Sequence, residues 1–74
     1  MKTIPNTLRE HRQKKYLAQI DIAARLGFRS SDRISRWEAG KTYPSLPNAL
    51  RLANLLGAPI EELYPDVPAD ERPD

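Results

Sequence analysis

The chain has 74 residues, no cysteine and one histidine, which excludes a fold held by disulfide bonds or by a zinc ion bound to cysteine and histidine. A chain of this length forms one domain at most, and we expect a small core of closely packed helices. Residues 1–43 carry a net charge of +6 and residues 44–74 a net charge of −4, which favours a polyanionic partner for the first part over ordinary solvated charge.

Proline and glycine divide the sequence into short helical segments, with little of the alternation that is typical of strands. The first expected helix covers residues 6–15. The second covers residues 19–26 and ends at Gly27, because glycine readily adopts the left-handed conformation that closes a helix. After a short turn, the third begins near Ser31 and ends before Gly40.

The pattern of residues 44–74 predicts two more helices and a tail. A fourth helix follows a Ser45 cap and ends at Gly57, and a short fifth helix covers residues 60–64. The apolar stripe of the fourth helix consists of Leu46, Ala49, Leu50, Ala53 and Leu56. We expect residues 1–65 to form one compact all-α domain and residues 66–74, acidic and rich in proline, to be disordered. The expected core consists of Leu8, Leu17, Ile22, Ala23, Leu26, Ile34, Trp37, Leu50, Ala53, Leu56, Ile60 and Leu63.

The third expected helix has a polar face that suits DNA. Ile34 and Trp37 are three residues apart, so they share a face and should anchor the helix to the core. Trp37 is therefore expected to be a core residue rather than a platform for a base. Four polar residues then point outward: Ser31, Asp32, Ser35 and Arg36. Such a helix fits a major groove about 12 Å wide, where an arginine can bind a guanine edge with two hydrogen bonds and a serine can donate or accept.

Four motifs occur in order along the chain: LRExR at residues 8–12, LxQxxxAxxLG at 17–27, IxxWExG at 34–40 and PSLxxALRLAxxLG at 44–57. On these motifs, the stretch from Leu8 to Tyr64 resembles the Cro/lambda-repressor-like family of helix-turn-helix regulators, also called the Xre family. The resemblance implies a compact five-helix, lambda-repressor-like DNA-binding domain. In that fold the second and third helices form the helix-turn-helix.

The resemblance also implies contacts with double-stranded DNA. Ser31, Asp32 and Arg36 match base-contacting positions, and Ser35 joins them from its place on the outward face. The implied phosphate contacts are Gln19, Ser30, Arg33, Lys41, Thr42 and Tyr43. Arg12 and Glu38 match a structural ion pair that joins the first helix to the third.

Several positions depart from the family's common pattern. The turn before Ile34 is one residue longer, so the assignments at residues 30–32 are open to a shift by one. Asp32 can accept a hydrogen bond from a cytosine amino group, interact favourably with the positive N-terminus of the helix, or pair with Arg36. The last two roles are structural, and we favour them. Ala18 and Pro59 replace the usual caps of the second and fifth helices, so we expect both helix starts to fray.

The expected function is sequence-specific transcriptional regulation, most simply repression, by a homodimer on a near-palindromic operator. Two alternatives stay open: an antitoxin that binds a partner toxin and represses its own operon, or a protein-interaction module that has lost DNA binding. No catalytic group, metal or cofactor is expected, because the single histidine, His11, has no partner histidine and no glycine-rich phosphate loop occurs. With no apolar stretch near the roughly 20 residues that span a bilayer and no signal peptide, we expect a soluble, cytoplasmic, nucleoid-associated protein of bacterial, phage or mobile-element origin.

Overall fold

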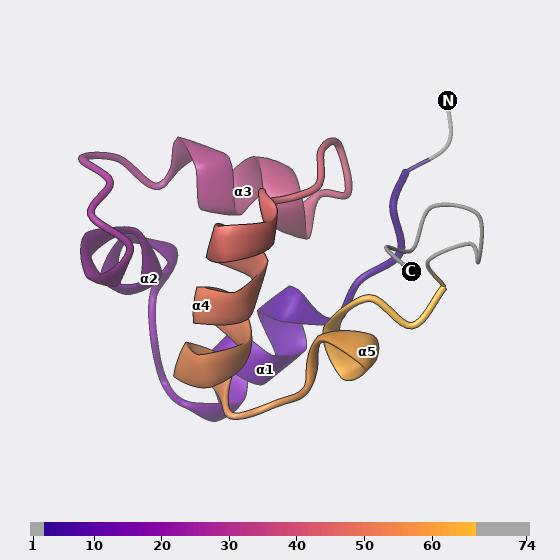
Figure 1. Ribbon diagram of the computed structural model, residues 1–74. Coiled ribbons are helices and arrows are strands. Elements are labelled where there is room, and N and C mark those ends of the chain that lie inside the picture. The colour runs from indigo at the N-terminus through magenta and orange to yellow at the C-terminus, as the bar shows by residue number, and fades with distance from the viewer. Residues whose placement is uncertain (1–2, 67–74) are drawn as a thin grey trace.

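The computed structural model describes residues 3–66, and this part of the chain contains five α-helices and no strand. The helices are α1 (Leu8–Lys14), α2 (Gln19–Arg25), α3 (Asp32–Glu38), α4 (Leu46–Leu56) and α5 (Ile60–Leu63). Figure 1 shows α3 along the top of the molecule, α4 beneath it, and α1 and α5 on the side opposite α3. The predicted all-α fold with five helices is confirmed. The expected tail, apart from Asp66, lies outside the described residues.

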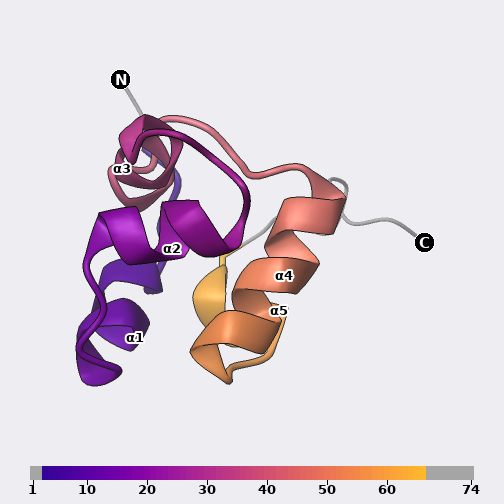
Figure 2. The same ribbon diagram turned by 90° about the vertical axis from the view of Figure 1, so that its left-hand side faces the viewer.

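α2 and α3 lie across one another, since Figure 1 shows α2 end-on and α3 lengthwise, whereas Figure 2 shows the reverse. The change of direction occurs at Gly27, whose φ of +83° is in the left-handed region. The backbone N–H of Phe28 then donates to the Ala23 carbonyl at 2.8 Å, which closes the end of α2. The predicted glycine turn therefore sets α3 across α2.

Of the two helix starts that were expected to fray, that of α2 is held by another group, whereas α5 has no side-chain cap at its start and is tied to the rest of the domain at its C-terminal end. At α2, the Asp21 carboxylate accepts a hydrogen bond from the backbone N–H of Ala18 at 2.7 Å, so an acid inside the helix replaces the missing hydroxyl cap. The short helix α5 is tied to the segment before α1. There the Thr7 hydroxyl donates to the Glu62 carbonyl at 2.7 Å, and the Thr7 N–H donates to the Leu63 carbonyl at 3.0 Å.

The core lies between the helices and agrees with most of the prediction. Eight predicted core residues are buried: Leu8, Ile22, Ala23, Leu26, Ile34, Trp37, Leu56 and Leu63. Leu17, Ala53 and Ile60 are partly buried against them. Leu52 and Tyr64, which were not predicted, are also buried. None of the helices within residues 3–66 is long and apolar enough to cross a membrane.

The prediction for α4 is wrong at two positions. Leu50 was expected in the core but is 54% exposed, and Leu46 of the predicted apolar stripe is 65% exposed. The buried stripe consists of Ala49, Leu52 and Leu56. α4 has apolar residues around most of its circumference, so its sequence alone fits two overlapping stripes, and packing against the other helices selects one of them.

The end of α3 is fixed by the segment that precedes α1. The Ile4 N–H donates to the Gly40 carbonyl at 2.7 Å, and the Asn6 amide donates to the Trp37 carbonyl at 3.0 Å. A side chain at Gly40 would place its Cβ 2.5 Å from the Ile4 carbonyl oxygen, and the φ of this residue is +75°. Only glycine satisfies both conditions, and the close contact holds the C-terminal end of α3 in place.

Candidate nucleic-acid interface

The two sides of α3 differ as the sequence predicts. Ile34 and Trp37 are 2% and 4% exposed and pack into the core. Asp32, Arg33, Ser35 and Arg36 are exposed, and Ser31, directly before the helix, is half-buried. The side chains of Ser35 and Arg36 have no hydrogen-bond or ion-pair partner within residues 3–66. These two residues therefore combine a fixed backbone position with hydrogen-bonding groups that remain available to a ligand.

The N-terminus of α3 is capped by Ser30 rather than by Ser31. The Ser30 hydroxyl accepts a hydrogen bond from the backbone N–H of Asp32 at 3.4 Å, whereas Ser31 makes no side-chain cap. Asp32 lies in the first turn, where a negative charge interacts favourably with the helix dipole. Asp32 and Arg36 form no ion pair within residues 3–66. Of the two structural roles considered for Asp32, the structure therefore has the interaction with the helix N-terminus and not the pair with Arg36.

Arg33 is held by an aromatic ring on the turn between α2 and α3. Its guanidinium lies 4.6 Å from the centre of the Phe28 ring, the geometry of a cation–π contact. The Phe28 ring in turn meets the Trp37 ring edge-on, with the ring centres 5.9 Å apart. This stack fixes the direction of Arg33, and only the presence of Phe28 in the turn could have indicated it from the sequence.

Glu38, on the inner side of α3, forms the centre of a buried polar cluster. Its side chain is 1% exposed. The carboxylate accepts hydrogen bonds from Arg12 at 2.6 and 3.1 Å and from Gln19 at 3.0 Å. It also forms an ion pair with Arg9 at 3.5 Å. Burial by itself would raise the pKa of the Glu38 carboxyl, but the hydrogen bonds from Arg12 and Gln19 and the charge of Arg12 outweigh it and hold the pKa below its ordinary value. The hydrogen bond to Glu38 likewise raises the pKa of Arg12.

Gln19 links this cluster to the surface. Its side-chain amide donates one hydrogen bond to Glu38, a contact that the sequence did not predict. The amide nitrogen carries a second proton, and the backbone N–H of this residue belongs to the first turn of α2, where helix N–H groups have no acceptor within the helix. Because one amide proton of Gln19 is bonded to Glu38, its expected phosphate contact requires the other amide proton or the backbone N–H.

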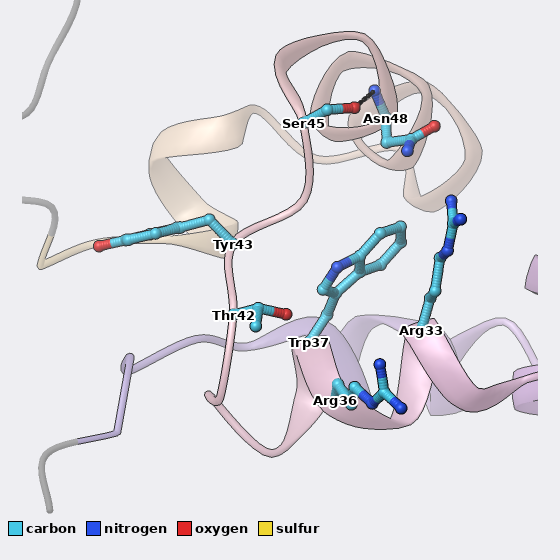
Figure 3. A pocket seen from close by; sticks show the side chains of 7 residues that line it. All are labelled: Arg33, Arg36, Trp37, Thr42, Tyr43, Ser45 and Asn48. Atoms are coloured by element: carbon cyan, nitrogen blue, oxygen red, sulfur yellow. Dashed lines mark hydrogen bonds between the residues drawn. The ribbon is translucent and has the colours of Figure 1, made fainter.

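The loop after α3 and the first turn of α4 border a hollow of about 310 Å³, which we call the α3–α4 hollow. Figure 3 shows the side chains that line it: Arg33, Arg36, Trp37, Thr42, Tyr43, Ser45 and Asn48. It brings together four predicted DNA-contacting residues from α3 and the loop. Lys41 is exposed but does not line it, while Ser45 and Asn48 were not predicted as contacts. The ring of Tyr43 is held against Tyr64, with the ring centres 5.6 Å apart.

Two helices crossing at a glycine turn, with an exposed basic face on the second, define a helix-turn-helix DNA-binding domain. The chain matches the helix-turn-helix family over residues 8–63, and it belongs to that family. Its fold is of the lambda-repressor type and its helix-turn-helix is of the Cro/C1 type found in Xre regulators. No curated protein matches the chain.

Proposed function

We propose that this protein is a repressor that binds a near-palindromic DNA operator as a dimer. The observation that supports this most is the outward face of α3, where Ser35 and Arg36 are exposed and have no partner within residues 3–66. We assign base contacts to Ser31, Asp32, Ser35 and Arg36. Ser30, Arg33, Lys41, Thr42, Tyr43 and Gln19 are assigned to backbone phosphates, which position the helix without reading sequence.

The proposed dimer follows from the size of the domain. The described part of one copy extends over 32 × 27 × 21 Å. Half-sites on one face of DNA lie about 34–36 Å apart, one turn of the double helix. Two copies side by side on adjacent half-sites therefore touch over a small area only. The exposed Leu46 and Leu50, one turn apart on α4, are the apolar residues that we assign to this contact.

A contact made mainly by these two leucine side chains buries less surface than a stable interface, which buries about 800 Å² on each partner. We therefore expect a monomer in solution that dimerises on DNA. Leu50→Ser should abolish cooperative binding to two adjacent half-sites but leave binding to one half-site unchanged. Cooperative binding by Leu50→Ser equal to that of the wild-type protein would exclude α4 as the contact.

Selection of bound sequences from a random double-stranded DNA library tests the proposed function directly. We expect an enriched motif with two-fold symmetry, and affinity that falls steeply as salt rises from about 50 to 200 mM. Weak association that is insensitive to salt, with no enriched motif, would instead indicate a protein-interaction module. An antitoxin would co-purify with a toxin. It would also be expected to expose apolar residues on α5, where Ile60 is half-buried and Leu63 is buried.

A further inference from the structure

The α3–α4 hollow carries positive charge that has no acidic partner within residues 3–66. Arg33 and Arg36 line the hollow, and none of its other lining residues is acidic. The cations of the ion pairs within residues 3–66 all lie on α1, so neither of these arginines is paired there. Thr42 and Ser45 add hydroxyl groups. A carboxylate, which accepts hydrogen bonds and carries negative charge, matches this composition.

The described part of the chain ends beside this hollow. Figure 3 shows Tyr43 at one edge of the hollow and Arg33 at the other. The ring of Tyr43 packs against that of Tyr64, with the ring centres 5.6 Å apart. Tyr64 directly follows α5 and lies two residues before Asp66, the last residue described. The sequence after Asp66 therefore starts close to the edge of the hollow that Tyr43 forms.

That following sequence is acidic, and it is long enough to cross the hollow. Residues 67–74, which we call the acidic tail, have a net charge of −2 from three acids and one base: Asp70, Glu71, Asp74 and Arg72. Eight residues reach about 26 Å when extended, and the described part of the molecule measures 32 × 27 × 21 Å. A tether of this length also keeps the acids at a high effective concentration near the arginines.

We propose that the acidic tail covers the α3–α4 hollow of its own chain and competes there with DNA. Asp70 and Glu71 accept hydrogen bonds from the arginines of the hollow in place of DNA phosphates. This inference rests on the proposed function, which assigns these arginines to DNA. Exposed ion pairs are individually weak, so DNA can displace the tail. Covering lowers the apparent affinity according to the fraction of molecules that is covered, by the same factor for every DNA sequence.

Two double variants with the same change in charge test the competition. Asp70→Asn with Glu71→Gln should bind a random-sequence DNA duplex about threefold more tightly than the wild-type protein at about 0.1 M salt, the gain for a tail that covers about two-thirds of the molecules. The control, Glu10→Gln with Glu61→Gln, removes two exposed acids on the side of the molecule opposite α3 (Figure 1). It should gain less than about 1.5-fold, because charges further apart than the Debye length of about 10 Å are screened. An equal gain in both would overturn the inference, since net charge alone would explain it.

A spin label on the tail tests its position without DNA. The chain has no cysteine, so Pro73→Cys creates a single site for a nitroxide and leaves the charges of the tail unchanged. When the tail covers the hollow, the nitroxide should broaden the indole N–H resonance of Trp37, the only tryptophan, whose side chain lines the hollow. The broadening should disappear at about 1 M salt, where the Debye length is about 3 Å. It should also disappear when Asp70→Asn and Glu71→Gln are added. Broadening that persists in both cases would reflect the tether alone and would overturn the inference.

The outcomes separate this inference from the proposed function. If the duplex binds but the spin label leaves the Trp37 resonance sharp, the inference is wrong and the proposed function stands. Broadening that increases with protein concentration would place the tail on a second copy and would exclude the contact within one chain. If no duplex binds even at low salt, the proposed function and the competition are rejected together.

Discussion

The inner and outer sides of α3 differ in whether their polar side chains have partners within the domain. On the inner side, Glu38 is nearly inaccessible to solvent and its two oxygens meet donors from Arg12, Gln19 and Arg9. On the outer side, Ser35 and Arg36 are exposed and their side chains have no partner within residues 3–66. The two sides are separated by the width of a single seven-residue helix.

This difference shows how a small domain can hold a recognition surface rigid. A buried carboxylate with a full set of donors fixes the orientation of α3 relative to α1 and α2. The donors on the other side are then presented at fixed positions to a ligand, with little ordering left to occur on binding. The inner side contributes stability and the outer side contributes binding, so the two should respond differently to substitution.

The largest effect is expected from Glu38→Ala. It leaves Arg12, whose side chain is 12% exposed, without its partner. Breaking a buried ion pair by removing one member costs about 3–5 kcal/mol, which we expect in the free energy of unfolding measured with a denaturant. The control, Glu61→Ala, removes an exposed acid from α5 and should cost less than about 1 kcal/mol. A similar loss in both variants would contradict the assigned role of the inner cluster.

Acid should weaken the same cluster without a mutation. The pKa of Glu38 is lowered in the folded protein, so its stabilising contribution is complete above the ordinary glutamate pKa of about 4.3 and is lost as the pH falls through the lower, folded value. The free energy of unfolding should therefore decrease in that acidic range. In Glu38→Gln, which has no charge to lose at this position, the decrease should be smaller. Identical pH profiles would show that other carboxylates govern acid unfolding.

A smaller effect is expected on the outer side, where it concerns binding rather than stability. Arg36→Ala should weaken operator binding by about 1–3 kcal/mol and relax the preference at one base position. Lys41→Ala should weaken binding equally for all sequences and lower the salt slope by about one. Both residues are exposed, so the melting temperature should not change. If Arg36→Ala weakens all sequences equally, then Arg36 binds phosphate and the base contacts lie elsewhere.

The sequence predicted the helices and most of the core because both depend on local patterns. Gly27 and Gly40 mark helix ends, and both have the left-handed φ that this position favours. The failure at Leu46 and Leu50 has a physical reason: α4 has apolar residues on more than one face, and only contacts with distant helices choose which face is buried. Such contacts leave no local signal in the sequence.

The candidate interface could be predicted only in part, for a related reason. The outward position of Ser35 and Arg36 follows from helical spacing around Ile34 and Trp37. The bond between Gln19 and Glu38 joins residues on two different helices, so no spacing within one helix indicates it. Asn48 enters the α3–α4 hollow because the loop after α3 brings α4 back toward it, which likewise depends on the tertiary fold.

The smallest effect is expected at Tyr16, which belongs to neither side of α3. It is 95% exposed and has a φ of 56°, the only positive φ among non-glycine residues in the described part of the chain. The left-handed conformation costs about 1–2 kcal/mol for such a residue, and glycine avoids that cost at an entropic penalty of about 0.5–1 kcal/mol.

Tyr16→Gly should therefore stabilise the fold by about 0.5–1 kcal/mol in thermal or denaturant unfolding. Tyr16→Phe keeps the strained conformation and should leave stability unchanged, so it separates backbone strain from loss of the phenol hydroxyl. Neither variant should alter DNA affinity, because this turn follows α1, on the side of the molecule opposite α3 (Figure 1). A loss of affinity in both variants would extend the interface to the turn between α1 and α2, and the division between the two sides of α3 would no longer describe how the domain binds DNA.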